Sequence, residues 1–351
     1  MHMIRKGQVR TDKEKQELRG PVKSVLLETA QYEEQDGQIV EKPWFSHTIS
    51  FDHNGWLIEQ INRNQDGSEW RTLNGYSVSG KLLTTRNYDP VGVLRSEVRY
   101  IYGDEGKLAA EQYMAPDGKV TTPTTYSYDI EGRKTKIQEF DNPGKANLLI
   151  GIEGTNSLIS AGDTKRIETR YDERGEAVEV RIFNTDGVLI SRMEITRDAY
   201  GNPLEEVRYV GDVVPLSPCA SGSCLTEEVA ALTEEQKAES AAELARLFVP
   251  GTALSKHIHR YDEKRRLIES KLTMMGMEAS HQTFAYDEAG NKIEEVSYNE
   301  DGTLSSKAIL TRDYDEQGNW TKEVVSTASS WDAEFGLSTP EHVTRRVITY
   351  W

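Results

Sequence analysis

Short segments in which apolar and polar residues alternate recur along most of this chain. The segments 177–183 and 292–298 are examples, each rich in β-branched and aromatic side chains and of strand length. Alternation places Tyr126 and Tyr128 on one face of such a segment, while the residue between them faces the other way. The pattern therefore predicts a series of β-strands, of which 22–29 is the first.

A repeated turn signal, Tyr-Asp-x-x-Gly, separates these segments. Successive copies lie about 26 residues apart, as for Gly106 and Gly132 (132 − 106 = 26). Two insertions, near 142–165 and 212–256, interrupt the period. The clearest copies close at Gly132, Gly175, Gly290 and Gly318, and weaker ones close at Gly55, Gly80, Gly106, Gly201 and Arg265.

A second glycine follows the first at a fixed offset in most repeats (67 − 55 = 12), often directly after an Asp. Asp-Gly is favoured in tight hairpin turns because glycine accepts a positive φ. For the same reason we expect a positive φ at the glycine that closes Tyr-Asp-x-x-Gly, for example Gly132. In Tyr-Asp-x-x-Gly, the Asp side chain can bond forward to the turn backbone. Each repeat is thus predicted to be one hairpin, in an antiparallel meander of roughly twenty strands that must twist and curl. The second glycines are Gly67, Gly92, Gly118, Gly144, Gly187 and Gly302.

These units resemble the YD repeats of the bacterial RHS and wall-associated repeat proteins. The likeness rests on Tyr-Asp-x-x-Gly followed by Asp-Gly, and it covers about 45–325. It implies a spiralling β-sheet shell or an extended envelope protein. Members of that family often carry a C-terminal toxin domain; none is expected before Trp351, so the toxin-shell role is not carried over.

We therefore predict an all-β protein of tandem antiparallel β-hairpins, curled into a spiral, open barrel or shell, with one helical insertion. Residues 1–20 are predicted to form a polar N-terminal arm, and 21–351 a single repeat domain. The insertion 142–165, rich in Gly, Asn and Ser, predicts a loop. The insertion 212–256 predicts a cysteine-containing loop followed by a helix at about 233–249.

The predicted helix has an apolar stripe that includes Leu244, Leu247 and Phe248. Such a stripe must be buried, either as a structural plug or cap on the sheet, which we favour, or as a movable lid or partner-binding helix. Cys219 and Cys224, the only cysteines, precede it. A disulfide between them in an oxidising compartment is favoured over free thiols.

The chain has 351 residues and a formal net charge of 42 − 58 = −16. Contacts to phosphates need clustered Lys and Arg, so the acidic balance argues against nucleic acid as a partner. No apolar run approaches the roughly 20 residues of a membrane-spanning helix. No export signal is recognisable, but a removed signal would leave the same start, and we expect a periplasmic, cell-surface or secreted protein.

Standard catalytic signatures, such as Gly-x-Ser-x-Gly and His-Glu-x-x-His, are missing from the sequence, and no cofactor is expected. His257 and His259 alternate on one predicted strand face together with Tyr261. They either replace aromatic packing, which we favour, or act as metal ligands or acid–base groups. The second role requires carboxylates that converge from elsewhere in the chain.

A glutamate recurs four residues after several closing positions. A stacked column of carboxylates would raise some pKa values or bind cations, and a pair such as Glu269 and Glu294 could cleave a glycosidic bond if one stayed protonated. Solvated carboxylates that face Arg and Lys on neighbouring strands are the favoured interpretation. The residues are Glu59, Glu179, Glu205, Glu269 and Glu294.

Aromatic side chains are the third group of candidates. Trp56 and Trp320 lie just past their turns, where exposed rings could stack on sugars. Tyr261 and Tyr286 are further candidates for ligand binding, although packing between strands is the favoured role of these aromatic residues.

These features predict a non-catalytic envelope or secreted scaffold of the YD-repeat type that binds a glycan or a protein. The alternative is a hydrolase, acting on carbohydrate, with a carboxylate/His site near the second insertion.

Overall fold

The computed structural model describes residues 11–35, 38–103, 105–140, 149–151, 158–160, 164–212, 249–329 and 339–351. Cys219, Cys224, Gly144 and the predicted helix up to residue 248 lie outside the described residues, so the disulfide and the helix stay predictions. No helix in the described ranges has the length and apolar character needed to cross a membrane.

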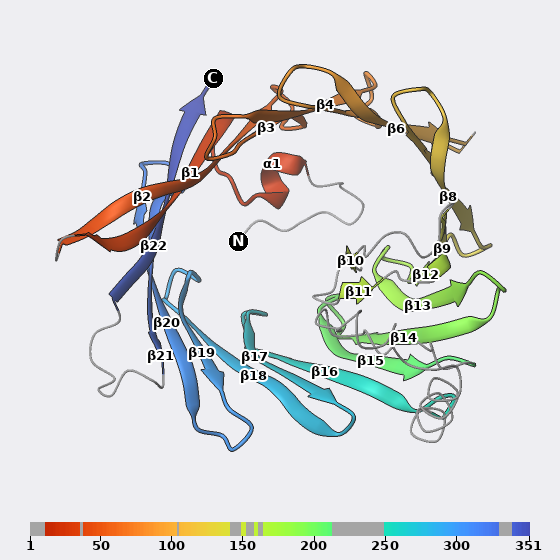
Figure 1. The fold of residues 1–351 in the computed structure, drawn as a ribbon. Coiled ribbons are helices and arrows are strands. Elements are labelled where there is room, and N and C mark those ends of the chain that lie inside the picture. The colour runs from red at the N-terminus through yellow and green to blue at the C-terminus, as the bar shows by residue number, and fades with distance from the viewer. Residues whose placement is uncertain are drawn as a thin grey trace, which may run out of the picture. The chain divides into compact units, whose positions relative to one another are not determined.

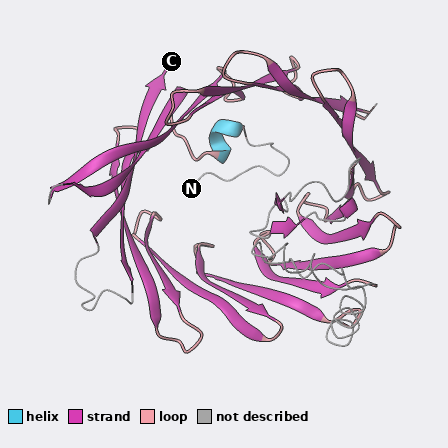
Figure 2. Cartoon of the chain, viewed as in Figure 1, coloured by secondary structure: helices cyan, strands magenta, loops and turns pink. Residues whose placement is uncertain are grey.

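The described chain is built almost entirely of β-strands (Figure 2). One short helix, α1 (Asp12–Lys15), precedes the first strand, within the predicted polar arm. The strands are β1 (Val22–Gln35), β2 (Gln38–Phe51), β3 (Leu57–Arg63), β4 (Glu69–Tyr76), β5 (Leu82–Tyr88), β6 (Leu94–Tyr102), β7 (Leu108–Met114), β8 (Val120–Tyr128), β9 (Lys134–Glu139), β10 (Leu149–Gly151), β11 (Leu158–Ser160), β12 (Thr164–Tyr171), β13 (Ala177–Asn184), β14 (Leu189–Arg197), β15 (Pro203–Val210), β16 (Ala253–Tyr261), β17 (Leu267–Met274), β18 (Met277–Tyr286), β19 (Lys292–Tyr298), β20 (Leu304–Tyr314), β21 (Trp320–Ser329) and β22 (Thr339–Tyr350).

The predicted fold class, all-β with antiparallel hairpins, is confirmed. Neighbouring strands pair antiparallel, as β3 does with β4 and β13 with β14, and β9 pairs in the same way with β12. The curl into a spiral, open barrel or shell stays a prediction. One detail differs from expectation, because the predicted loop 142–165 contains a two-stranded antiparallel pair, β10 with β11.

The Tyr-Asp-x-x-Gly signal forms a three-residue loop that ends in a left-handed residue. At the first copy, Asp52 N donates to Trp56 O at 3.0 Å, and the Asp52 carboxylate accepts from the amides of Asn54 and Trp56 at 2.9 Å. The forward bond of the Asp side chain is therefore confirmed. Gly132 has φ +81, which confirms the predicted left-handed glycine.

The repeated tyrosine closes the open end of its own hairpin. Tyr76 donates its hydroxyl hydrogen bond to the carbonyl of Leu57, the first residue of the preceding strand, at 3.0 Å. Tyr128 bonds to Leu108 in the same way, and Arg197 replaces the tyrosine with a bond from Nε to Ala177 O at 2.9 Å. A side chain that reaches one strand back thus fixes the ends of neighbouring strands.

The chain divides into two compact units. Unit 1 comprises Met1–Ile101, Glu111–Val120 and Phe284–Trp351, and unit 2 comprises Tyr102–Ala110 and Thr121–Thr283. The prediction of a single repeat domain is not tested by this division.

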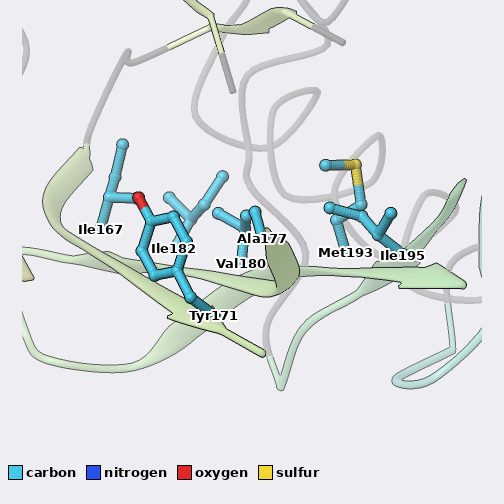
Figure 3. Packing of buried hydrophobic residues seen from close by; sticks show 7 residues of the cluster. All are labelled: Ile167, Tyr171, Ala177, Val180, Ile182, Met193 and Ile195. Carbon is cyan, nitrogen blue, oxygen red and sulfur yellow. The ribbon is translucent and has the colours of Figure 1, made fainter. Parts of the chain in front are cut away.

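Unit 2 has a hydrophobic core on one face of β12, β13 and β14. Figure 3 shows its seven buried side chains. The register places Val180 opposite both Thr169 and Met193, so these residues share the buried face across three strands. The core residues are Ile167, Tyr171, Ala177, Val180, Ile182, Met193 and Ile195.

Unit 1 joins the two ends of the chain. β22 pairs antiparallel with β1, and Figure 1 shows these strands, from the blue and red ends of the chain, side by side. Leu18, Val22, Val25 and Phe51 form the core beside them. The segment 11–20 therefore packs against unit 1 through Leu18.

Candidate functional site

His257 and His259 lie on β16 with their side chains on the same face, as the alternation predicted. Their ring centroids are 4.1 Å apart, with the ring planes inclined at 46°. His259 is only 2% exposed, and His257 is half-buried.

A carboxylate from the neighbouring strand joins the two histidines. Glu206 on β15 is directly opposite His257 in the strand register. Its Oε1 lies 3.4 Å from His259 Nε2, and both side chains are buried. One potential metal-ligand atom from each of the three residues lies within 4.8 Å of the others. We call Glu206, His257 and His259 the His cluster.

Ser270 on β17 contacts both imidazoles of the His cluster. Its Oγ is 2.7 Å from His257 Nε2 and 3.4 Å from His259 Nδ1. Burial and the neighbouring His259 lower the pKa of His257, which favours its neutral form near pH 7, although the charge of Glu206 acts in the opposite direction.

The five recurrent glutamates do not converge on the His cluster. Each is ion-paired with Arg or Lys on an adjacent strand, as the favoured interpretation expects, but Glu179 is buried rather than solvated. Glu269 pairs with Arg260 at 3.0 Å and alternates with Ser270, so it faces away from the two histidines. Burial raises the pKa of Glu269, but hydrogen bonds from Arg260 and His281 outweigh it, and the net pKa is lowered. The remaining pairs are Glu59–Arg71 at 2.5 Å, Glu179–Arg170 at 2.9 Å, Glu205–Lys256 at 2.7 Å and Glu294–Lys307 at 2.7 Å.

The aromatic candidates after the turns are partly covered by neighbouring residues. Trp56 stacks on Tyr76 with ring centroids 5.7 Å apart, and the guanidinium of Arg346 lies 3.5 Å from the ring centroid of Trp320. Tyr261 donates its hydroxyl to Pro203 O at 3.0 Å, the hairpin-closing bond of its repeat. Tyr286 is half-buried at the end of β18.

An exposed aromatic pair occurs elsewhere, at Trp44 and Phe45 on β2. Phe45 is opposite Thr29 and Pro43 is opposite Ala30, so Trp44 is an extra residue that forms a β-bulge. Trp44 is 52% exposed. Bulges of this kind redirect a side chain away from the regular alternation.

Trp44 lines an open groove in unit 1. The groove consists of two adjoining cavities of about 620 and 450 Å³ that share five lining residues, including Trp44 and Phe45. One side is the turn between β3 and β4, which supplies Asn64, Gln65 and Asp66. We call the site lined by Thr29, Trp44, Phe45, Asn64, Gln65 and Asp66 the aromatic groove.

Charged and polar side chains continue the aromatic groove along the outer part of the β1–β2 hairpin. Glu41 accepts a hydrogen bond from Arg345 at 2.7 Å, and this bond lowers the pKa of Glu41. In the described strands, pairing of β2 with β3 ends at Ser46 and Arg63, so residues 38–45 extend beyond β3. Figure 1 shows this hairpin projecting past its neighbours.

Sequence reasoning missed Glu206, and it counted Trp44 among the aromatic residues without singling it out. The periodic offset drew attention to Glu205, whereas the strand alternation turns the adjacent Glu206 towards the histidines. Finding it would have required the register of β15 and β16, which a long insertion separates. A bulge at Trp44 has no comparable sequence signal beyond the Pro-Trp-Phe run.

No family model matches the chain, and no curated protein matches it. Among solved structures, a porin-like protein from Bacteroides uniformis has 8% identity and a TM-score of 0.38, with 94% of this chain and 98% of that chain covered. The structure of TcdB2-TccC3-Cdc42 has 12% identity and a TM-score of 0.39, with 86% of this chain and 13% of that chain covered. A porin-like protein from Bacteroides vulgatus has 9% identity and a TM-score of 0.20, with coverage of 94% and 98%.

Proposed function

We propose that this protein is a non-catalytic, YD-repeat scaffold of the cell envelope or a secreted form of one, and that it binds a glycan in the aromatic groove. The observation that carries the proposal is the exposed Trp44 at a β-bulge beside the polar turn 64–66. Apolar ring faces of sugars stack on flat aromatic side chains, while amides and carboxylates bond to their hydroxyls. The groove's volume lies in the range of ligand sites.

A glycan fits this groove better than a peptide added as an extra strand. Pro43 offers no N–H, and the bulge at Trp44 disrupts the regular spacing of backbone groups along the edge of β2. Both features blunt an edge against strand addition. A protein partner that adds a strand at this edge is therefore not the proposal.

The hydrolase alternative has less support. A glycosidase of the two-carboxylate type needs one carboxyl group whose pKa is raised. Glu269 has a lowered pKa, and the other recurrent glutamates are ion-paired.

The test is a panel of immobilised oligosaccharides, followed by calorimetry with the best-binding member. Trp44→Ala should weaken that binding by roughly 10-fold or more, because a stacked aromatic contact is lost. Trp70→Ala is the matched control, since Trp70 is 43% exposed on β4 but does not line the groove. Equal losses in the two variants, or no binding to any oligosaccharide, would contradict the proposal. Mass spectrometry of the recovered oligosaccharide checks catalysis: an intact chain supports a binding protein, and a cleaved chain supports the hydrolase.

A further inference from the structure

The His cluster combines three features that a structural packing role does not require together. Its members come from two adjacent strands, they carry the side chains that zinc prefers, and two of them are almost fully buried. A histidine pair that merely replaced aromatic packing would have no need of a carboxylate in contact with its ring.

The orientation of the His259 ring indicates that its Nε2 could bind a metal ion. Its Nε2 is buried and makes no hydrogen bond to any of the described residues, although it lies 3.4 Å from Glu206 Oε1. Two ligands on a tetrahedral zinc ion, each about 2.1 Å from the metal, are roughly 3.4 Å apart. The separation of these two atoms therefore matches an edge of a zinc coordination tetrahedron.

Ser270 supplies the outer support that metal-binding histidines usually have. It contacts Nε2 of His257 and Nδ1 of His259, which leaves the other nitrogen of each ring for a metal. In known sites, such outer contacts fix the tautomer and the ring orientation of the ligating histidine.

We propose that Glu206, His257 and His259 bind one zinc ion, held in place by Ser270 as a positioning residue. One potential ligand atom of each residue already lies within 4.8 Å of the other two, so side-chain rotations of His257 and Glu206 would complete the set without a change in the backbone. Three protein ligands leave the fourth position of a tetrahedral zinc ion for a ligand from outside the set. His257 is the one member of the His cluster that is partly exposed.

The site is independent of the aromatic groove. It lies on β15 and β16 in unit 2, whereas Trp44 lies on β2 in unit 1. A failure to bind glycan would therefore not affect the zinc proposal, and a failure to bind zinc would not affect the glycan proposal.

The experiment titrates ZnCl₂ into the full chain after treatment with a chelator and removal of that chelator. We expect one zinc ion per chain with a Kd of about 1 μM or tighter, and a rise in Tm with zinc. Glu206→Gln should weaken zinc binding by about 100-fold or more, and Ser270→Ala by about 10- to 100-fold. Loading with Co²⁺ should give the visible absorption of a tetrahedral site, which a packing role would not produce.

Glu205→Gln is the matched control. Glu205 is adjacent in sequence but lies on the other face, where it pairs with Lys256 at 2.7 Å. This variant should bind zinc as tightly as the unaltered protein. If Glu206→Gln does not fold, as judged by circular dichroism, His257→Gln at the half-buried position replaces it. Unaltered protein that takes up no zinc at micromolar concentrations, or a ligand variant that binds as tightly as the control, would overturn the proposal.

Discussion

Met275 occupies a left-handed backbone conformation that is costly for most residues other than glycine and asparagine. It has φ +51 and precedes Gly276 with φ +85, in the two-residue turn that joins β17 and β18. Both values are typical of a type I′ hairpin turn, which favours Asn-Gly over Met-Gly. The side chain of Met275 is 54% exposed, so its removal costs little packing.

We therefore expect Met275→Asn to raise the free energy of unfolding by roughly 0.5–1 kcal/mol, because asparagine tolerates the left-handed conformation. Urea denaturation at constant m-value measures the effect. Met277→Asn is the control, since Met277 is similarly exposed but lies within β18. A gain in the control that equals the gain at Met275 would argue against the turn as its cause.

The backbone conformations of single turn residues could be predicted from the sequence. Contacts between side chains far apart in the chain could not. The sequence predicted the left-handed Gly132 and the forward-bonding Asp because each acts within its own turn. The approach of Glu206 to His259 depends on a register across an insertion, and no local pattern encodes it.

Among the elements, the turns contribute a shared sensitivity to acid. At Asp287, hydrogen bonds from the side chain and backbone of Asn291 lower the pKa of the carboxyl group. The same direction holds at other turn aspartates, whose carboxylates also accept hydrogen bonds. They are Asp66, Asp89, Asp129, Asp198, Asp262, Asp301 and Asp315.

A carboxyl group with a folded pKa below its unfolded value stabilises the fold when it is ionised. We expect this contribution to be complete above the unfolded pKa of about 4 and to be lost as the pH falls through the lower folded values. Urea midpoints measured from pH 6 to pH 2.5 should therefore decrease mainly below pH 4.

Asp287→Asn combined with Asp315→Asn should lower the midpoint at pH 6 and flatten its decrease in acid, because two of the titrating groups are gone. A decrease of unchanged size in the double variant would show that other carboxylates dominate the acid sensitivity.

The existence of the strands was predicted correctly, but the bounds of some strands were not. β19 has the bounds that the alternation indicated, since its flanking turns are both marked by glycine. β1 runs six residues past its predicted end (35 − 29 = 6), because the outer part of the β1–β2 hairpin is polar and exposed, and no hydrophobic face marks it.

For the whole molecule, the repeats in the sequence did not predict one feature: the last strand, β22, pairs with the first, β1. Thr344 of β22 lies opposite Thr29 of β1 and opposite Glu323 of β21, so it sits between two partners. Local turn chemistry specifies the sequential hairpins but carries no information on pairing between residues about 315 positions apart.

Thr344→Pro should destabilise unit 1 by about 1–3 kcal/mol, because proline cannot donate a ladder hydrogen bond within a central strand and leaves the partner group unpaired. Hydrogen exchange should then become faster in β1 as well as in β22. Thr344→Val, which keeps the strand conformation, should preserve the protection of both. Unchanged exchange in β1 of the proline variant would contradict the pairing of the two strands.

The hairpin-closing bond of Tyr261 spans 58 residues of chain, whereas those of Tyr76 and Tyr128 span 19 and 20. Both insertions lie at the same point of the repeat, between the two strands of one hairpin, and β9 still pairs with β12, as β15 pairs with β16. The entropic cost of a longer loop rises only slowly with its length. The repeat can thus acquire new sequence at this point without a change in how its strands are matched, which makes it the natural place for grafting foreign segments onto this protein.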